Sequence, residues 1–258
     1  MGKDILLFAA KDVGTELFDY LLQTKAPIDR LIAGGPDNRK ILDLAKKNGI
    51  PAGAYEKHTQ AQLADEGDRY EWLLNLYSPH ILRPDTLALA DHRLNAHSSL
   101  VPHCRGNDGS AWAIRKGLPA GVSLIEIRDG IDEGEVYCQT EVPYFFPVPG
   151  FELHERLKRE LVALFKRSWQ QIYSGAIRPI PQDGPVTYHT RRQTERDRIL
   201  DASETSSLED FVQWMLAHDF SPGTTAEIRY RGRTYGLRLS VEEKPASGVQ
   251  NPRQGDGR

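Results

Sequence analysis

The sequence predicts an α/β fold built on a doubly wound, mostly parallel sheet, followed by a small α+β unit. Short runs that are wholly apolar, such as residues 5–10, are typical of strands buried on both faces of a parallel sheet. They alternate along the first half of the chain with segments whose apolar residues have helical spacing, such as residues 15–22. Because strands that alternate with helices form βαβ units, this order indicates a Rossmann-like arrangement.

The elements expected after these two follow in a regular order. Strands are predicted over residues 28–33, 72–77 and 94–98, and helices over residues 41–48, 60–66, 84–90 and 110–116. Two segments of alternating polarity, 122–127 and 136–142, are expected to pair antiparallel at the edge of the sheet. Residues 151–173 have the apolar spacing of a long amphipathic helix.

The composition changes after this helix, since residues 177–185 are rich in Pro and Gly and indicate a boundary. Beyond them the patterns predict a helix over residues 206–216 and a hairpin whose two strands are residues 226–230 and 234–239. The closing residues are dominated by Pro, Gly, Ser, Gln and Asn and are expected to be disordered. We therefore expect a large N-terminal domain, a small C-terminal α+β subdomain and a tail, over residues 1–180, 186–241 and 242–258.

Composition and charge narrow the class of protein. The net charge of −3, from 33 basic and 36 acidic residues, argues against a general nucleic-acid binder. Two cysteines, Cys104 and Cys138, are too few for a disulfide framework. No stretch approaches the ~20 apolar residues of a membrane span, and the first residues lack the pattern of a signal peptide. We expect a cytoplasmic protein with neither a membrane nor a nucleic acid as its partner.

The densest group of polar residues lies at 95–106, with the sequence Asn-Ala-His-Ser-Ser-Leu-Val-Pro-His-Cys-Arg-Gly. Alternation along a strand puts Asn95 and His97 on the same face. At the carboxyl end of a sheet strand that face opens toward the crevice in which open α/β sheets bind ligands. An amide and an imidazole there suit acyl transfer, because the imidazole can take a proton while the amide donates to a developing oxyanion.

Each of these residues also has a plainer interpretation. A single His or Asn in a strand is more often structural than catalytic, and Asp132, in a loop bracketed by glycines, is by itself typical of a turn. Ser98 or Ser99 could act as a nucleophile, but no Gly-x-Ser-x-Gly elbow surrounds them.

Several motifs in order resemble the N10-formyltetrahydrofolate-dependent formyltransferases. Residues 95–106 are similar to that family's Asn-x-His-x-Ser-Leu-Leu-Pro…Arg-Gly signature, with Val101 in place of the second Leu. Residues 130–142 resemble its Asp-x-Gly…Gln segment, and residues 75–82 its folate-lining strand and turn. The resemblance runs from about residue 4 to residue 240. It implies N10-formyltetrahydrofolate as the co-substrate and no metal.

The resemblance also implies roles for particular residues. Asn95 donates to the oxyanion of the tetrahedral intermediate, His97 acts as the base or donates beside Asn95, and Asp132 orients His97. Which of His97 and Asp132 is the base stays open. Folate contacts are implied for residues of two segments: His80, Ile81 and Leu82, and the backbone of Arg128, Asp129, Gly130 and Ile131. Ile81 and Leu82 have the alternative interpretation of an apolar wall.

The acceptor is expected to contact the first loop and the Arg-Gly pair, at Lys11, Asp12, Arg105 and Gly106. Arg105 either anchors the acceptor's phosphates or braces its loop. Residues 187–241 look like the small C-terminal unit of sugar-nucleotide N-formyltransferases, which implies a nucleotide-linked amino-deoxysugar as the acceptor and polysaccharide biosynthesis, such as that of O-antigen, as the setting.

The alternatives to that acceptor are another small amine, a peptide natural product and methionyl-tRNA. A non-catalytic folate-binding module and a formyl-folate hydrolase are the remaining hypotheses. A homodimer is among the expected states of assembly.

Overall fold

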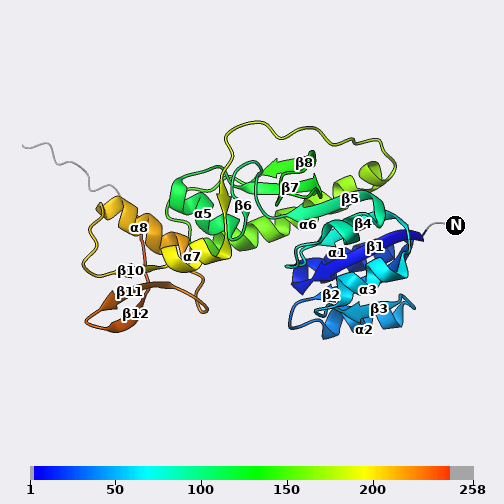
Figure 1. Cartoon of the computed structure of the whole chain (residues 1–258). Helices are drawn as coiled ribbons and strands as arrows, with labels where there is room; N and C mark the ends of the chain where they lie inside the picture. Colours follow the sequence, from blue (N-terminus) through cyan, green and yellow to red (C-terminus); the bar gives the residue numbers. More distant parts are fainter. Residues whose placement is uncertain (1–2, 245–258) are drawn as a thin grey trace, which may run out of the picture.

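The computed structural model describes residues 3–244 and centres on a seven-stranded sheet of order β3-β2-β1-β4-β5-β7-β8 (Figure 1). In chain order the strands are β1 (Lys3–Ala10), β2 (Ile28–Gly34), β3 (Ala52–Ala54), β4 (Tyr70–Leu76), β5 (Ala90–His97), β7 (Gly121–Glu126) and β8 (Val136–Glu141). The first five are parallel, whereas β5 pairs with β7, and β7 with β8, in antiparallel fashion. The predicted fold class and the predicted antiparallel pair at the sheet edge are confirmed.

Helices cover both faces of this sheet, in accord with a doubly wound fold. One face packs against α1 (Lys11–Gln23), α2 (Arg39–Lys47), α5 (Gly109–Lys116) and α6 (Gly150–Tyr173), and the other against α3 (Thr59–Glu66) and α4 (Pro84–Leu87). Alternate residues of β1 enter the two resulting cores, Leu7 on one face and Leu6 and Phe8 on the other, and all are fully buried. A strand covered on both sides has no solvent-facing position for a polar residue, which explains the continuous apolar run.

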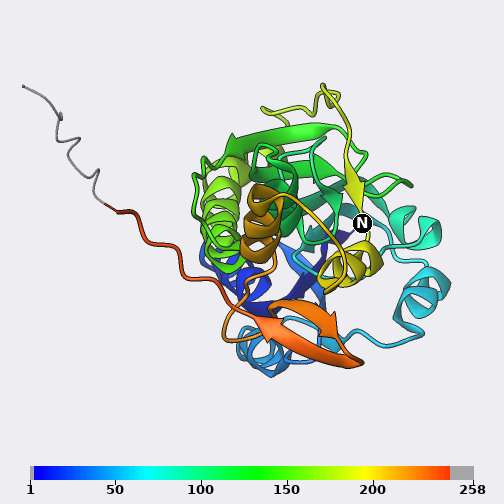
Figure 2. The ribbon, with the colours of Figure 1, turned by 90° about the vertical axis from the view of Figure 1, so that its left-hand side faces the viewer.

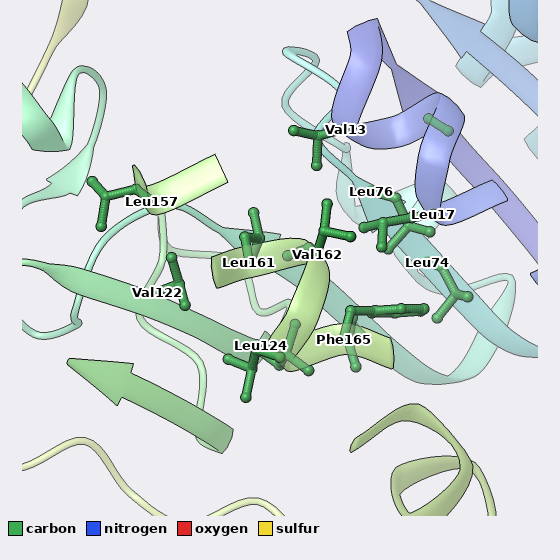
Figure 3. Packing of buried hydrophobic residues seen from close by; sticks show 14 of the residues in the cluster. Val13, Leu17, Leu74, Leu76, Val122, Leu124, Leu157, Leu161, Val162 and Phe165 are labelled. Atoms are coloured by element: carbon green, nitrogen blue, oxygen red, sulfur yellow. The ribbon is translucent and has the colours of Figure 1, made fainter. Parts of the chain in front are cut away.

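Helix α6 is the main packing element of the larger core. Its side chains Leu157, Leu161 and Phe165 meet residues of β4, β7 and α1 (Figure 3). They recur at spacings of four residues and therefore lie on one face of the helix. None of the helices described between residues 3 and 244 is long and apolar enough to cross a membrane.

The sequence placed most elements within a few residues of their observed bounds, with one clear error and several omissions. The helix predicted over 84–90 is wrong in its extent, because α4 ends at Leu87 and Ala90 already pairs with Tyr70 as the first residue of β5. The omitted elements are short: β3, β6 (Arg105–Gly106), β9 (Tyr188–His189), α7 (Arg191–Asp197) and β10 (Ile199–Asp201).

The C-terminal elements lie at the opposite end of the molecule from β2 and β3 (Figures 1 and 2). A three-stranded sheet joins β10, β11 (Ala226–Tyr230) and β12 (Arg233–Leu237), the last two forming the predicted hairpin. Helix α8 (Leu208–Ala217) packs on α5 and adds Leu216 and Ala217 to the main core. The three-part division expected from the sequence stays a prediction, and all but residues 242–244 of its tail lie outside the described residues.

A partly buried ion cluster around Asp197, the last residue of α7, joins the C-terminal elements to α5. Its carboxylate lies 2.8 Å from Nε2 of His218 and 3.3 Å from Nε of Arg115, and Trp214 donates its ring N–H to the backbone carbonyl of Asp197 at 2.5 Å. Burial alone would raise the pKa of the Asp197 carboxyl, but the hydrogen bond from His218 and the charge of Arg115 outweigh it and hold this pKa below its usual range.

We expect Asp197→Asn to lower the free energy of unfolding by about 1–2 kcal/mol at pH 7, because a charge-assisted and partly solvated cluster is lost. A carboxyl whose pKa is lower in the folded protein stabilises it above the unfolded-state pKa of about 3.9 and loses that effect as the pH falls through the folded-state value. The difference between variant and wild type should therefore shrink below about pH 4. Urea titrations of both proteins at pH 7 and below pH 4 measure this difference in the free energy of unfolding. Equal stabilities at pH 7 would contradict the expectation.

Candidate functional site

A crevice of about 390 Å³ opens beside the carboxyl ends of β4 and β5. Its lining comes from the loop after β4, the end of β5, the β6–α5 loop and the loop 127–132 that follows β7, together with single residues of α1, α6, α7 and the segment after α8. This is the edge at which the sequence predicted a site, since ligands of open α/β sheets bind outside the carboxyl ends of the strands.

The three residues predicted to carry the chemistry meet in this crevice. The carboxylate of Asp132 accepts a hydrogen bond from Nδ2 of Asn95 through Oδ1 at 3.1 Å and one from the backbone N–H of Gly106 through Oδ2 at 2.8 Å. Nε2 of His97 lies 3.4 Å from the same Oδ2. One largely buried carboxylate therefore joins the amide and the imidazole of β5 to the start of the β6–α5 loop. The catalytic roles of the three residues stay predictions.

Glycines allow the backbone segments around Asp132 to approach one another. A Cβ at Gly106, whose φ is +88°, would overlap the carbonyl oxygen of His189 in the paired strand β9. A Cβ at Gly134 would overlap the carbonyl oxygen of Glu126. Both positions therefore require glycine, and the loop after β7 can fold back over the face of β5.

The residues predicted to contact folate line one wall of the crevice. The ring of His80 stacks on Tyr55 with 3.5 Å between centroids, and burial holds the pKa of His80 below its usual value. Leu82 is buried in the smaller core, whereas Ile81 is 72% exposed at the rim. The lining also includes Arg128, Asp129, Gly130 and Ile131, of which Arg128 is paired with two carboxylates, those of Glu126 and Glu135.

The residues predicted to contact the acceptor divide into two pairs. Lys11 and Gly106 line the crevice, with the Lys11 ammonium 5.5 Å from the centre of the Tyr77 ring. Asp12 is instead ion-paired with Lys158 of α6. The guanidinium of Arg105 donates to Oε1 of Gln182 at 2.8 and 3.1 Å. Arg105 thus braces its loop against Gln182, and its contact with an acceptor stays a prediction.

The lining also includes Tyr77, from the predicted folate-lining segment, and residues whose place there the sequence did not predict, among them Asp108, His154, Arg191 and Phe220. The Tyr77 hydroxyl lies 3.4 Å from Nε2 of His154, and the Phe220 ring meets the His154 ring edge-on at 6.0 Å. Burial raises the pKa of Tyr77 to about 12 and lowers that of His154. A neutral phenol can therefore donate toward a neutral imidazole. His154, Arg191 and Phe220 come from distant parts of the chain, and no local pattern marks them.

Several polar atoms of the lining are buried without a hydrogen-bond partner among residues 3–244. They are Oδ1 of Asn75, Oγ of Ser78, Nε2 of His80, Nε2 of His97, Oδ2 of Asp108 and Oγ of Ser110. A buried polar group costs free energy unless it is hydrogen-bonded, so these atoms are available to a polar ligand.

The match to a family model assigns this fold and crevice to the formyl transferase class. The model of the formyl transferase family matches residues 36–162, the part of the chain that holds Asn95, His97 and Asp132. The chain therefore carries a formyl transferase domain, and the resemblance predicted from its motifs is confirmed.

Known proteins are similar to this chain in sequence or in fold. A methionyl-tRNA formyltransferase of Acidithiobacillus ferrooxidans is 26% identical over 148 residues, which cover 57% of this chain and 45% of that protein. A sugar N-formyltransferase from Shewanella sp FDAARGOS_354 has the same fold, with a TM-score of 0.78 at 17% identity over 94% of this chain and 99% of that one. The formyltransferase PseJ from Anoxybacillus kamchatkensis is 26% identical, with a TM-score of 0.51 over 65% of this chain and 88% of its own.

These similarities differ in extent. The chain spans about half the length of the first curated relative and up to 66% of others. The similarity to the Shewanella protein covers both chains almost completely but shows the fold alone.

We expect Gly106→Ala to lower kcat for formyl transfer at least about tenfold, because a Cβ there displaces β9 or the N–H that holds Asp132. Strain at a positive φ alone costs about 1–2 kcal/mol. Gly117→Ala is the matched control, since Gly117 has φ +60° at the end of α5 and open space around its Cβ position. Both variants should lose stability, and only Gly106→Ala should lose turnover in the folded fraction. An unchanged kcat in Gly106→Ala would argue against the assigned role of this N–H.

Proposed function

We propose that this protein transfers the formyl group of N10-formyltetrahydrofolate to the amine of a nucleotide-linked amino-deoxysugar, giving the N-formyl sugar and tetrahydrofolate. One observation carries the proposal: a single buried carboxylate, Asp132, holds an amide and an imidazole between two differently lined walls of one crevice. The first wall, with His80, suits a planar heterocycle. The second wall suits a phosphate-bearing acceptor.

In such a transfer the acceptor nitrogen bonds to the formyl carbon and the bond to N10 then breaks, with negative charge on the formyl oxygen in between. Asn95 uses one of its two amide hydrogens on Asp132, which leaves the other to donate to that oxygen. Nε2 of His97 lies 3.4 Å from Oδ2 of Asp132 without a hydrogen-bond partner within residues 3–244, so it can take the proton that leaves the amine and pass it to N10 as the bond to N10 breaks. The hydrogen bond to Asp132 fixes the Asn95 amide before the reaction, and the same carboxylate lies beside the His97 imidazole.

The second wall supports an acceptor with a base and phosphates. It combines the cationic side chains of Lys11 and Arg191 with the aromatic ring of Phe220. Cationic groups match a diphosphate, and an aromatic ring offers a surface on which a nucleobase can stack. The structure of PseJ, at 26% identity, holds UDP-4,6-dideoxy-4-formamido-L-AltNAc and tetrahydrofolate, which supports this acceptor class. A cytoplasmic location and a homodimer remain part of the proposal.

The second candidate acceptor is methionyl-tRNA, because the curated relatives carry that name. Formation of tetrahydrofolate should be measured with a panel of dTDP-, UDP- and GDP-linked amino sugars, with methionyl-tRNA, and without acceptor. We expect turnover with at least one sugar nucleotide only. The Asn95→Ala variant should lower this kcat by ~10²–10³, the usual cost of one lost oxyanion donor. Turnover with the tRNA alone would refute the sugar acceptor, and formate release without acceptor would indicate a hydrolase.

A substitution at Arg191 tests separately whether the second wall binds the acceptor. Its side chain is 63% exposed and lies 3.5 Å from Asp108, so it is free to turn toward a phosphate. We expect Arg191→Ala to raise the acceptor KM about tenfold, since one charge-assisted contact is lost, and to leave the folate KM unchanged. Arg192→Ala is the matched control, because Arg192 is the exposed neighbour outside the lining. Equal acceptor KM values for the two variants would remove Arg191 from the acceptor site.

A further inference from the structure

We infer that Gln182 is a positioning residue of the active site, which fixes Asp132 from outside the crevice. Its effect on kcat is measured in the formyl transfer, so this part of the inference rests on the proposed function. Gln182 belongs to the segment after α6 that runs back across β8 and β7 (Figure 1). Its composition indicates a boundary, yet Ile180 in it pairs with Val136 of β8 through both backbone hydrogen bonds, at 2.7 and 2.9 Å. The segment is therefore tied to the edge of the sheet just before Gln182.

The amide of Gln182 uses all four of its hydrogen-bonding positions. Its nitrogen donates to the carbonyl oxygens of Asp132 at 2.8 Å and of Gly134 at 2.7 Å. Its oxygen accepts from Nη2 of Arg105 at 2.8 Å and from Nε at 3.1 Å. Two donors facing two carbonyls and one acceptor facing a guanidinium define the orientation of this amide, and no other uncharged side chain of that length offers the same set.

These contacts act on the backbone that carries the Asp132 carboxylate. Asp132 has φ +54°, in the left-handed region, and Gly134 is pressed against Glu126, so few conformations are open to this loop. Hydrogen bonds to the carbonyls of residues 132 and 134 fix the two peptide planes that contain these carbonyls. The direction in which the Asp132 side chain leaves the backbone is thereby set.

The contacts also close a ring through β6. Arg105 holds the Gln182 oxygen with its side chain, while its neighbour Gly106 donates its backbone N–H to Oδ2 of Asp132. The ring therefore runs from the Asp132 carboxylate through Gly106, Arg105 and Gln182 back to the Asp132 carbonyl. Breaking it at Gln182 removes the partner of Nε and Nη2 of Arg105 and of the two carbonyls at once, so the loop gains freedom at the point where catalysis requires a fixed carboxylate.

The test compares three variants. Gln182→Ala removes the ring, and Gln182→Glu keeps the size and the Arg105 contact but turns an acceptor toward two carbonyl oxygens. Asp183→Ala, one residue on and exposed, is the matched control. We expect kcat to fall about tenfold or more in both Gln182 variants, with both KM values within about twofold of wild type and the control unchanged. A residue that only stabilises the fold would lower the melting temperature and leave kcat of the folded fraction intact.

A second readout does not depend on the reaction. The backbone N–H of Gly106 should exchange with solvent at least about tenfold faster in Gln182→Ala and in Gln182→Glu than in Asp183→Ala, because its acceptor is released. A wild type without turnover on any acceptor refutes the proposed function and leaves this measurement as the test of the inference. The inference is overturned if Gly106 exchange in both Gln182 variants stays at the control value, or if an active wild type and both variants share the same kcat.

Discussion

The carboxylate of Asp132 is the group on which the geometry of the crevice depends. Its side chain is 9% exposed, and a carboxylate at that depth is stable only when charges or hydrogen-bond donors satisfy it. The Asn95 amide and the N–H of Gly106 fill that role, with the His97 ring beside them, so β5 and β6 must lie within reach of one loop. The strand before that loop ends at Glu126, which pairs with Leu94, and the loop therefore has to fold back along β5. The glycines at 106 and 134 are consequences of this requirement.

The two walls around that carboxylate have different origins in the chain. The wall with His80 belongs to the segments after β4 and β7, within the part that matches the formyl transferase family. The opposite wall takes Arg191 and Phe220 from C-terminal elements, which the Asp197 cluster and α8 attach to α5. Substitutions at Arg191 or Phe220 can therefore alter that wall without changing Asn95, His97 or Asp132. This separation fits a family in which one chemistry serves several acceptors.

The sequence predicted what local patterns encode. The apolar run of β1 marks a doubly covered strand, and a contiguous motif holds Asn95 and His97 two residues apart, so both could be identified. Strands β6 and β9 have two residues each and carry no periodicity, yet their pairing holds Gly106 in place. Gln182 lies in a Pro- and Gly-rich stretch that indicates only a boundary, and its partner Arg105 is 77 residues away. Such contacts depend on how the chain returns to the sheet edge, which no window of neighbouring residues records.

The return of the segment after α6 also has a consequence for synthesis on the ribosome. The chain leaves the ribosome with its N-terminus first, so the three residues at the centre of the crevice are synthesised well before Gln182 and His189. A nascent chain that has reached the end of α6 holds Asn95, His97 and Asp132. It lacks Gln182, whose amide binds the loop of Asp132, and β9, which pairs with β6. The site is therefore completed late, when the chain has folded back over its own sheet, and the order of translation delays the formation of a competent crevice.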